Sequence, residues 1–115
     1  LLASSDAVTL HAPLADDTRA MIGAAELDRM RPQALLINTS RGGLVDERAL
    51  TEALAGGRIR GAAFDTFERE PPEGSRLLEL NNFVASPHAG GATVEAVTRA
   101  GVTAVRELLA EGPDR

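Results

Sequence analysis

The sequence of 115 residues contains no cysteine, lysine, tryptophan or tyrosine, and three phenylalanines are its only aromatic residues. Without cysteine the chain cannot form disulfides, thiolate metal sites or a cysteine nucleophile, and a reducing, cytoplasmic location is expected. The twelve basic residues are all arginines, they form no cluster, and the net charge is −5. Because phosphate backbones are bound by clustered cations, nucleic acid is excluded as a general partner.

No apolar run approaches the roughly 20 residues that a membrane-spanning helix needs, and no signal-peptide pattern is found at Leu1, so no membrane partner is expected. Hydrophobic residues at 43% and charged residues at 25% are typical of a globular domain with a packed core. A chain of this length forms at most one domain. Since residue 1 is not Met and Leu1–Asp6 has the pattern of a helix end, we expect a fragment of a longer protein.

The stretch Ala34–Glu47, with the sequence ALLINTSRGGLVDE, combines a strand, a turn and the start of a helix. Ala34–Asn38 is a short continuous apolar run, which is typical of a strand buried on both faces of a parallel sheet. Thr39–Gly43 is a polar turn at the carboxyl end of that strand, where open α/β sheets bind their ligands. Asp46 can cap the following helix, which Gly56–Gly57 ends.

Strand-like and helix-like patterns alternate along the chain. The expected strands lie at 7–11, 34–38, 59–64 and 82–85. A short helix near 25–30 precedes the second strand, whereas a charged, proline-containing loop and one helical turn precede the fourth. Such alternation predicts right-handed β-α-β crossovers, so the fold class is α/β, a parallel sheet with flanking helices.

A final helix is predicted from about Thr93 to Glu111, ended by Gly112–Pro113. Its apolar and small residues recur at helical spacing along one face. They are Val94, Val97, Gly101, Ala104, Val105 and Leu108.

Polar side chains follow the ends of three predicted strands. Because parallel strands share one carboxyl edge, Arg41, Asp65, Glu70 and His88 should meet on one side of the sheet. Arg41 can bind a carboxylate with its forked guanidinium, and His88 can donate or accept a hydroxyl proton near neutral pH. Glu70 can hold the imidazole in one tautomer and favour its protonated form. The pattern predicts proton-coupled chemistry on an α-keto or α-hydroxy acid, with a cofactor for hydride transfer.

Each candidate also has a purely structural interpretation. Arg41 could be a surface residue, Glu70 is one of three acids in the same loop, and Asp65 could be a turn or capping residue. His88 is the stronger candidate, because the glycines that follow it expose backbone N–H groups. For His11 we expect a structural or cofactor-packing role. No metal site is predicted.

Four stretches together resemble the D-isomer-specific 2-hydroxyacid dehydrogenase family, which includes phosphoglycerate, glyoxylate/hydroxypyruvate, formate and D-lactate dehydrogenases. They are His11–Leu14 with Thr18 (HAPL…T), Leu36–Glu47 (LINTSRGGLVDE), Asp65–Pro71 (DTFEREP) and Pro87–Thr93 (PHAGGAT). Their order and spacing are those of the family over essentially the whole chain. The resemblance implies a Rossmann-like sheet, NAD as cofactor and a 2-hydroxy or 2-keto acid as substrate.

The resemblance also assigns roles to single residues. Arg41 would bind the substrate, His88 would be the acid/base and Glu70 its carboxylate partner, so these three are the catalytic candidates. Asp65 would bind the nicotinamide carboxamide. The full set expected to line the cofactor pocket is Ala12, Pro13, Thr39, Ser40, Arg41, Asp65, His88, Gly90 and Gly91.

Three residues depart from the family pattern. Thr66 replaces the usual Val, Ala89 the usual Ile and Ser40 the usual Ala. We expect these changes to loosen packing beside the nicotinamide without removing a catalytic group.

The sequence contains no GxGxxG motif, the glycine turn that seats a dinucleotide's pyrophosphate. We therefore expect residues 1–115 to form a partial NAD-binding and catalytic domain, the second half of a dinucleotide-binding domain. The glycine-rich half and the substrate domain would be absent, and the complete protein would be a homodimer. The main hypothesis is part of an NAD-dependent dehydrogenase. The alternatives are a dinucleotide-sensing, corepressor-like binding protein and an inactive truncated remnant.

Overall fold

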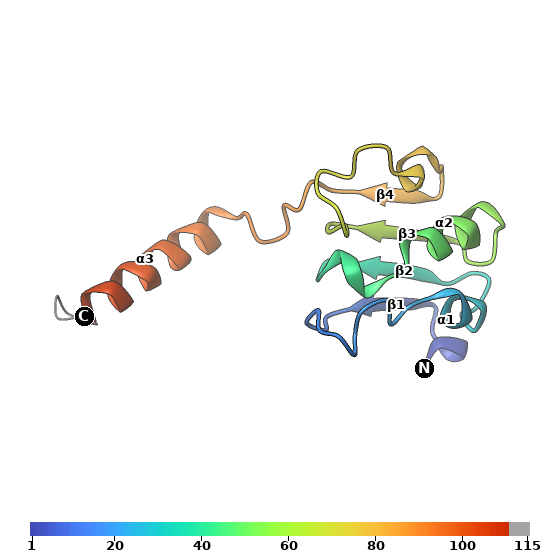
Figure 1. Ribbon diagram of the computed structural model, residues 1–115, viewed down its shortest axis with the longest axis horizontal. Coiled ribbons are helices and arrows are strands. Elements are labelled where there is room, and N and C mark those ends of the chain that lie inside the picture. Colours follow the sequence, from blue (N-terminus) through green and yellow to red (C-terminus); the bar gives the residue numbers. More distant parts are fainter. Residues whose placement is uncertain (111–115) are drawn as a thin grey trace.

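The computed structural model describes residues 1–110 and contains one sheet of four parallel strands (Figure 1). The strands lie side by side in the order β1 (Ala7–Leu10), β2 (Leu35–Asn38), β3 (Gly61–Phe64) and β4 (Phe83–Ala85). Helix α1 (Ala24–Asp28) connects β1 to β2, and α2 (Glu47–Ala55) connects β2 to β3. A loop and the 3₁₀ turn Arg76–Glu79 connect β3 to β4. The predicted α/β fold with a parallel sheet is confirmed.

The helix boundaries follow the local capping chemistry. Oδ1 of Asp46 accepts hydrogen bonds of 3.0 Å from the backbone N–H groups of Arg48 and Ala49, which confirms Asp46 as the N-cap of α2. Gly56 is the C-cap, and Gly57 adopts a positive φ of 66°, which glycine reaches without steric cost. The strands are one or two residues shorter at their ends than the apolar runs predict.

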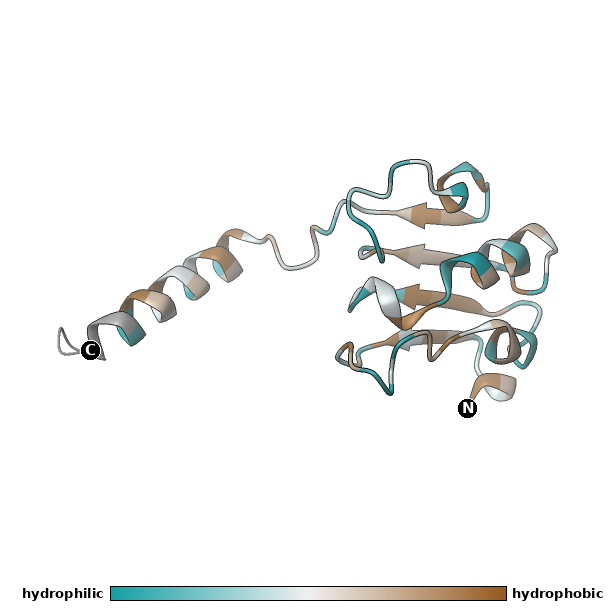
Figure 2. Ribbon diagram, in the orientation of Figure 1, coloured by the Kyte–Doolittle hydropathy of each residue, from teal (hydrophilic) through white to brown (hydrophobic). Residues whose placement is uncertain are grey.

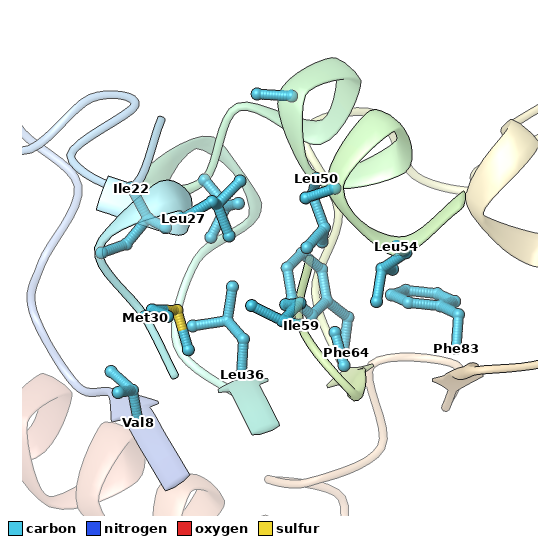
Figure 3. Packing of buried hydrophobic residues seen from close by; sticks show 14 of the residues in the cluster. Val8, Ile22, Leu27, Met30, Leu36, Leu50, Leu54, Ile59, Phe64 and Phe83 are labelled. Carbon is cyan, nitrogen blue, oxygen red and sulfur yellow. The ribbon is translucent and has the colours of Figure 1, made fainter. Parts of the chain in front are cut away.

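The core lies on one face of the sheet. Val8 and Leu10 of β1 are buried on this face, while their neighbours Ala7 and Thr9 point to the other face and are exposed. Helix α1, helix α2 and the turn Arg76–Glu79 cover the buried face. Figure 3 shows side chains from the strands meeting those from the helices; the labelled ones are Val8, Ile22, Leu27, Met30, Leu36, Leu50, Leu54, Ile59, Phe64 and Phe83. Each fully buried leucine contributes roughly 1.5 to 3 kcal/mol of transfer free energy.

The opposite face of the sheet is open within residues 1–110, so the prediction that 34–38 is buried on both faces is wrong for this chain. Leu35 of β2 is 38% exposed, Ile37 is partly exposed, and Val84 of β4 is 67% exposed. The reason is topological. Each strand lies next to the one before it in the sequence, so the chain always crosses over in the same direction along the sheet. Crossovers of the same handedness then place all their helices on one face.

Helix α3 (Val94–Ala110) points away from the sheet, which gives the molecule extents of 59 × 27 × 23 Å (Figure 1). The predicted helix is confirmed from its start, where Oγ1 of Thr93 accepts a hydrogen bond from the backbone N–H of Ala96. The apolar side of α3, visible as brown segments in Figure 2, includes the exposed residues Val94, Val97 and Val105. The side chain of Leu108 and the predicted end at 111–113 lie outside the described residues. No helix within 1–110 has the length and apolarity needed to cross a membrane.

Candidate active site

The carboxyl ends of the four strands meet at one edge of the sheet, as the parallel topology requires. Ala12–Leu14 follow β1, Thr39–Arg41 follow β2, Asp65 follows β3, and Ser86–His88 follow β4. The predicted convergence of the candidate residues is therefore found in the structure.

His88 and Glu70 form a direct pair at this edge. Nδ1 of His88 lies 2.7 Å from Oε2 of Glu70, and both side chains are partly exposed. The other oxygen, Oε1, accepts a 2.9 Å hydrogen bond from the backbone N–H of Phe67. The hydrogen bond with His88, followed by that from Phe67, lowers the pKa of Glu70, so the carboxylate stays ionised. Because a carboxylate only accepts, the proton lies on Nδ1 and leaves Nε2 for a substrate.

Asp65 fixes the turn that carries His88. The Asp65 side chain is buried and accepts hydrogen bonds from the hydroxyl of Ser86 and, at 2.9 Å each, from the backbone N–H groups of Ala89 and Gly90. These donors, Ser86 first, lower the pKa of Asp65. The backbone of His88 has a positive φ of 54°, which an L-residue keeps only when its surroundings impose it. Asp65 thus holds the histidine in this conformation.

Ser86 was not predicted as a site residue. The sequence gives only a weak signal for its role: Ser86 directly precedes Pro87–His88, and Asp65 follows the preceding strand. The pairing across two strands becomes visible only once their register is known.

Arg41 and His88 line the same hollow, which has a volume of about 480 Å³. Its remaining lining residues are Leu14, Arg19, Gly42, Gly43, Thr66, Phe67, Glu68 and Glu70. The exposed guanidinium of Arg41 donates one hydrogen bond, from Nη1, to the carbonyl oxygen of Ser40 at 2.8 Å. The hollow therefore combines a carboxylate-binding group with a histidine that can transfer a proton.

The turn that carries Arg41 is shaped by Asn38, a buried residue at the end of β2 that is not among the predicted site residues. Its Nδ2 donates to the carbonyl oxygen of Arg41 at 2.8 Å, and its Oδ1 accepts from the backbone N–H of Ser40 at 3.1 Å. The sequence signal that could have indicated this role is an asparagine between an apolar strand and a turn, because its side chain can form hydrogen bonds with the backbone that follows.

Four of the nine candidate cofactor residues, Ala12, Pro13, Ser40 and Arg41, line a second hollow of about 550 Å³ next to the first. Arg41 contributes to both hollows, and the other lining residues are His11, Ala12, Pro13, Leu14 and Ser40. Nε2 of His11 lies 3.0 Å from Oγ1 of Thr9, so this ring is tied to its own strand. Among the described residues, no three His, Asp or Glu side chains form a group that could hold a metal ion.

The other candidates lie at the rim of this edge. Thr39, Gly90 and Gly91 are exposed and line neither of the two hollows, although the N–H of Gly90 is engaged by Asp65. The chain offers no glycine-rich turn for the pyrophosphate.

A parallel sheet with this polar carboxyl edge defines the class as a partial Rossmann-like, dinucleotide-binding domain. Residues 1–90 match the family model described as "D-isomer specific 2-hydroxyacid dehydrogenase, NAD binding domain". The chain belongs to this family, as its four motifs predict. The description of the family model names an NAD-binding domain, which agrees with the expected cofactor.

Individual relatives agree with this assignment. The chain is 45% identical over 104 residues to D-3-phosphoglycerate dehydrogenase of Methanocaldococcus jannaschii, which covers 90% of this chain and 20% of that protein. It is 52% identical over 96 residues to glyoxylate reductase of Thermococcus litoralis, covering 84% of this chain and 29% of that protein.

Among solved structures, the NAD-complexed D-isomer specific 2-hydroxyacid dehydrogenase of Lactobacillus delbrueckii ssp. bulgaricus superimposes with a TM-score of 0.84 at 34% identity. The match covers 99% of this chain and 40% of that one. The chain thus spans two fifths or less of the length of these three relatives.

Proposed function

We propose that this chain supplies the catalytic half of the NAD-binding domain of a D-2-hydroxyacid dehydrogenase, which interconverts a D-2-hydroxy acid and a 2-keto acid. The observation that carries the proposal is the 2.7 Å pair between His88 and Glu70 beside a hollow that Arg41 also lines. Nothing in a purely structural role requires a paired imidazole and an exposed guanidinium to line one cleft.

In the reductive direction, Arg41 binds the carboxylate of the keto acid through its forked N–H donors and polarises the adjacent carbonyl. His88 donates a proton from Nε2 to the carbonyl oxygen, and in the oxidative direction it takes the hydroxyl proton back. Glu70 stabilises the imidazolium by accepting from Nδ1. NAD, when bound, supplies or accepts the hydride.

Toward NAD, we assign Ala12, Pro13, Ser40 and Arg41 to the wall of the 550 Å³ hollow and Asp65 to the nicotinamide carboxamide. Three donors already occupy the Asp65 carboxylate, but Oδ2 accepts only one of them and retains capacity for another. Thr39, Gly90, Gly91 and His88 complete the proposed cofactor contacts.

The rest of the enzyme lies outside this chain in our proposal. A glycine-rich half would seat the pyrophosphate, and a substrate domain would select the hydroxy acid and close over the site. The complete protein would be a cytoplasmic homodimer. The 115 residues alone would not catalyse hydride transfer.

The test is to express the polypeptide that the source gene encodes and to assay a panel of 2-keto acids with NADH and NADPH. We expect oxidation of the reduced cofactor that depends on the keto acid. Tight binding of NADH without turnover on any acid, together with a change in association state, would instead support the sensor. The purified 115-residue chain is assayed in parallel, and turnover by it would contradict the requirement for further domains.

A further inference from the structure

The peptide bond between Phe67 and Glu68 is held from two sides by the segment that follows Arg41. Oε1 of Glu47 accepts a 2.7 Å hydrogen bond from the backbone N–H of Glu68. On the other side, a Cβ placed on Gly42 would lie 1.9 Å from the carbonyl carbon of Phe67 and 2.2 Å from the nitrogen of Glu68. The backbone at Gly42 therefore lies directly against this peptide, and only glycine permits that approach.

The preceding peptide, between Thr66 and Phe67, leads to the paired histidine. The N–H of Phe67 donates to Oε1 of Glu70 at 2.9 Å, and Oε2 of Glu70 lies 2.7 Å from Nδ1 of His88. A series of contacts thus runs from Glu47, the first residue of α2, through the backbone of Glu68 and Phe67 to Glu70 and the imidazole. The phenyl ring of Phe67 is itself buried against Phe64 and Phe83, which anchors the middle of this series.

Glu47 is not a typical exposed acid of a first helical turn. The cap at Asp46 fixes the start of the helix, and the Glu47 side chain is partly buried against the loop. Burial raises the pKa of Glu47, while the hydrogen bond from Glu68 opposes the rise. A partly buried carboxylate that forms a short hydrogen bond to a loop 21 residues away differs from one that only interacts with the helix dipole.

We propose that Glu47 is a positioning residue for the acid/base pair: by holding the N–H of Glu68, it fixes the loop so that Glu70 orients His88 toward the hollow shared with Arg41. Helix α2 begins six residues after Arg41, so one short segment carries the substrate-binding arginine and also supports the histidine's partner. The catalytic consequence rests on the proposed function, whereas the coupling between Glu47 and His88 does not.

The coupling is tested in the 115-residue chain by NMR, with three variants and a control. Glu47→Ala removes the acceptor, Glu47→Asp keeps the charge at the helix start but shortens the reach, and Glu47→Gln keeps an acceptor oxygen. Glu52→Ala is the matched control, because Glu52 lies on the same helix and pairs with Arg48 at 3.4 Å. The readouts are amide hydrogen exchange at Phe67 and Glu68 and the ¹⁵N shifts of the His88 imidazole.

We expect Glu47→Ala and Glu47→Asp to accelerate exchange of the Glu68 amide by about fivefold or more, the loss expected for one hydrogen bond, and to shift the His88 nitrogens. Glu47→Gln should stay close to the unchanged protein. If Glu47→Asp resembles the Glu52→Ala control in both readouts, the helix-dipole interpretation is correct and the proposal is overturned. Asp retains the favourable charge at the helix start, so this comparison remains decisive if Glu47→Ala fails to fold.

The catalytic consequence is measured in the polypeptide that shows reductase activity. We expect kcat to fall about tenfold in Glu47→Asp with KM changed little, because the orientation of the proton donor is disturbed rather than binding of the carboxylate. Glu47→Gln should recover most of kcat. An unchanged kcat in Glu47→Asp overturns the proposal, whereas a complete absence of reductase activity in the unchanged protein refutes the proposed function and leaves the NMR result to decide on Glu47.

Discussion

The hydroxyl of Ser40 donates a 2.8 Å hydrogen bond to the carbonyl oxygen of Ala12, which ties the turn after β2 to the turn after β1. Both residues line the 550 Å³ hollow assigned to the cofactor. The sequence comparison with the family pattern predicts that Ser40, in place of alanine, loosens this region. The structure gives the opposite result, because the extra hydroxyl links two walls of the hollow.

Ser40→Ala should therefore lower the free energy of unfolding by about 0.5 to 1.5 kcal/mol, the usual net contribution of one hydrogen bond. Denaturant unfolding measures the change. Ser75→Ala is the control, because Ser75 precedes the turn Arg76–Glu79 without a side-chain hydrogen bond to it. Equal stabilities of the two variants would contradict the importance of the Ser40–Ala12 bond.

Thr66→Val should stabilise the chain. Thr66 is only 2% exposed, and its Oγ1 has no hydrogen-bond partner among residues 1–110. Valine has nearly the same shape, so the exchange removes the cost of an unsatisfied buried hydroxyl, about 1 to 2 kcal/mol. Thr51→Val is the comparison, since Oγ1 of Thr51 donates to the carbonyl oxygen of Glu47 at 2.7 Å and should gain nothing. A midpoint of urea unfolding that does not rise in Thr66→Val would argue against the prediction.

Gly42→Ala should destabilise the chain by about 1 to 3 kcal/mol or prevent folding, because its new Cβ would overlap the backbone of Phe67. Gly101→Ala is a suitable control: in the described part of the chain, nothing lies within 4 Å of a Cβ at Gly101 in α3, and alanine favours the helix. Thermal unfolding followed by circular dichroism compares the two. Equal melting temperatures would mean that the loop at Phe67 can move away freely.

His88→Ala should reduce kcat of the active polypeptide by about 10² to 10⁴, the usual contribution of a positioned acid/base. Arg41→Ala should instead raise KM for the keto acid as well as lower kcat, because the carboxylate loses its charged partner. Steady-state kinetics with a saturating cofactor separates the two patterns. Arg76→Ala, which removes an arginine away from the carboxyl edge, should leave both constants as they are.

The pKa of Asp65 lies below its ordinary value of 3.8 because Ser86, Gly90 and Ala89 donate to the carboxylate. A carboxyl whose pKa is lower in the folded state stabilises the fold above its unfolded pKa, and this contribution is lost as the pH falls through the folded pKa. Unfolding free energies measured from about pH 6 down to about pH 3 should therefore decline at the acidic end. Asp65→Asn should flatten this decline. An equally steep decline in that variant would assign the effect to other carboxyls, Glu70 among them.

The sequence predicts the sheet and its functional edge well, since the positions of Arg41, Asp65 and His88 follow from where apolar runs stop. A parallel arrangement then brings strand ends together without any knowledge of side-chain contacts. The His88–Glu70 pair was also predicted, although the choice of Glu70 among the three acids of its loop rested on the resemblance to the family.

Contacts between distant turns could not be predicted from the sequence. The bonds from Glu68 to Glu47 and from Ser40 to Ala12 join residues 21 and 28 positions apart, and each depends on the register of neighbouring strands. The burial of β2 on both faces was predicted incorrectly. The apolar side chains of Leu35 and Ile37 show only that this face of the sheet is suited to being covered by other parts of a protein. They do not show that this chain covers it.

The bonds of Asp65 end at Gly90, whereas helix α3 begins only at Val94. The histidine therefore lies on the sheet side of the joint, and the direction of the helix is set by the few residues beyond it. The chain therefore changes direction between the sheet and α3 at a point that follows His88 in the sequence. Because Asp65 holds the backbone at Ala89 and Gly90, a change in the direction of α3 can be absorbed after Gly90 without displacing the imidazole.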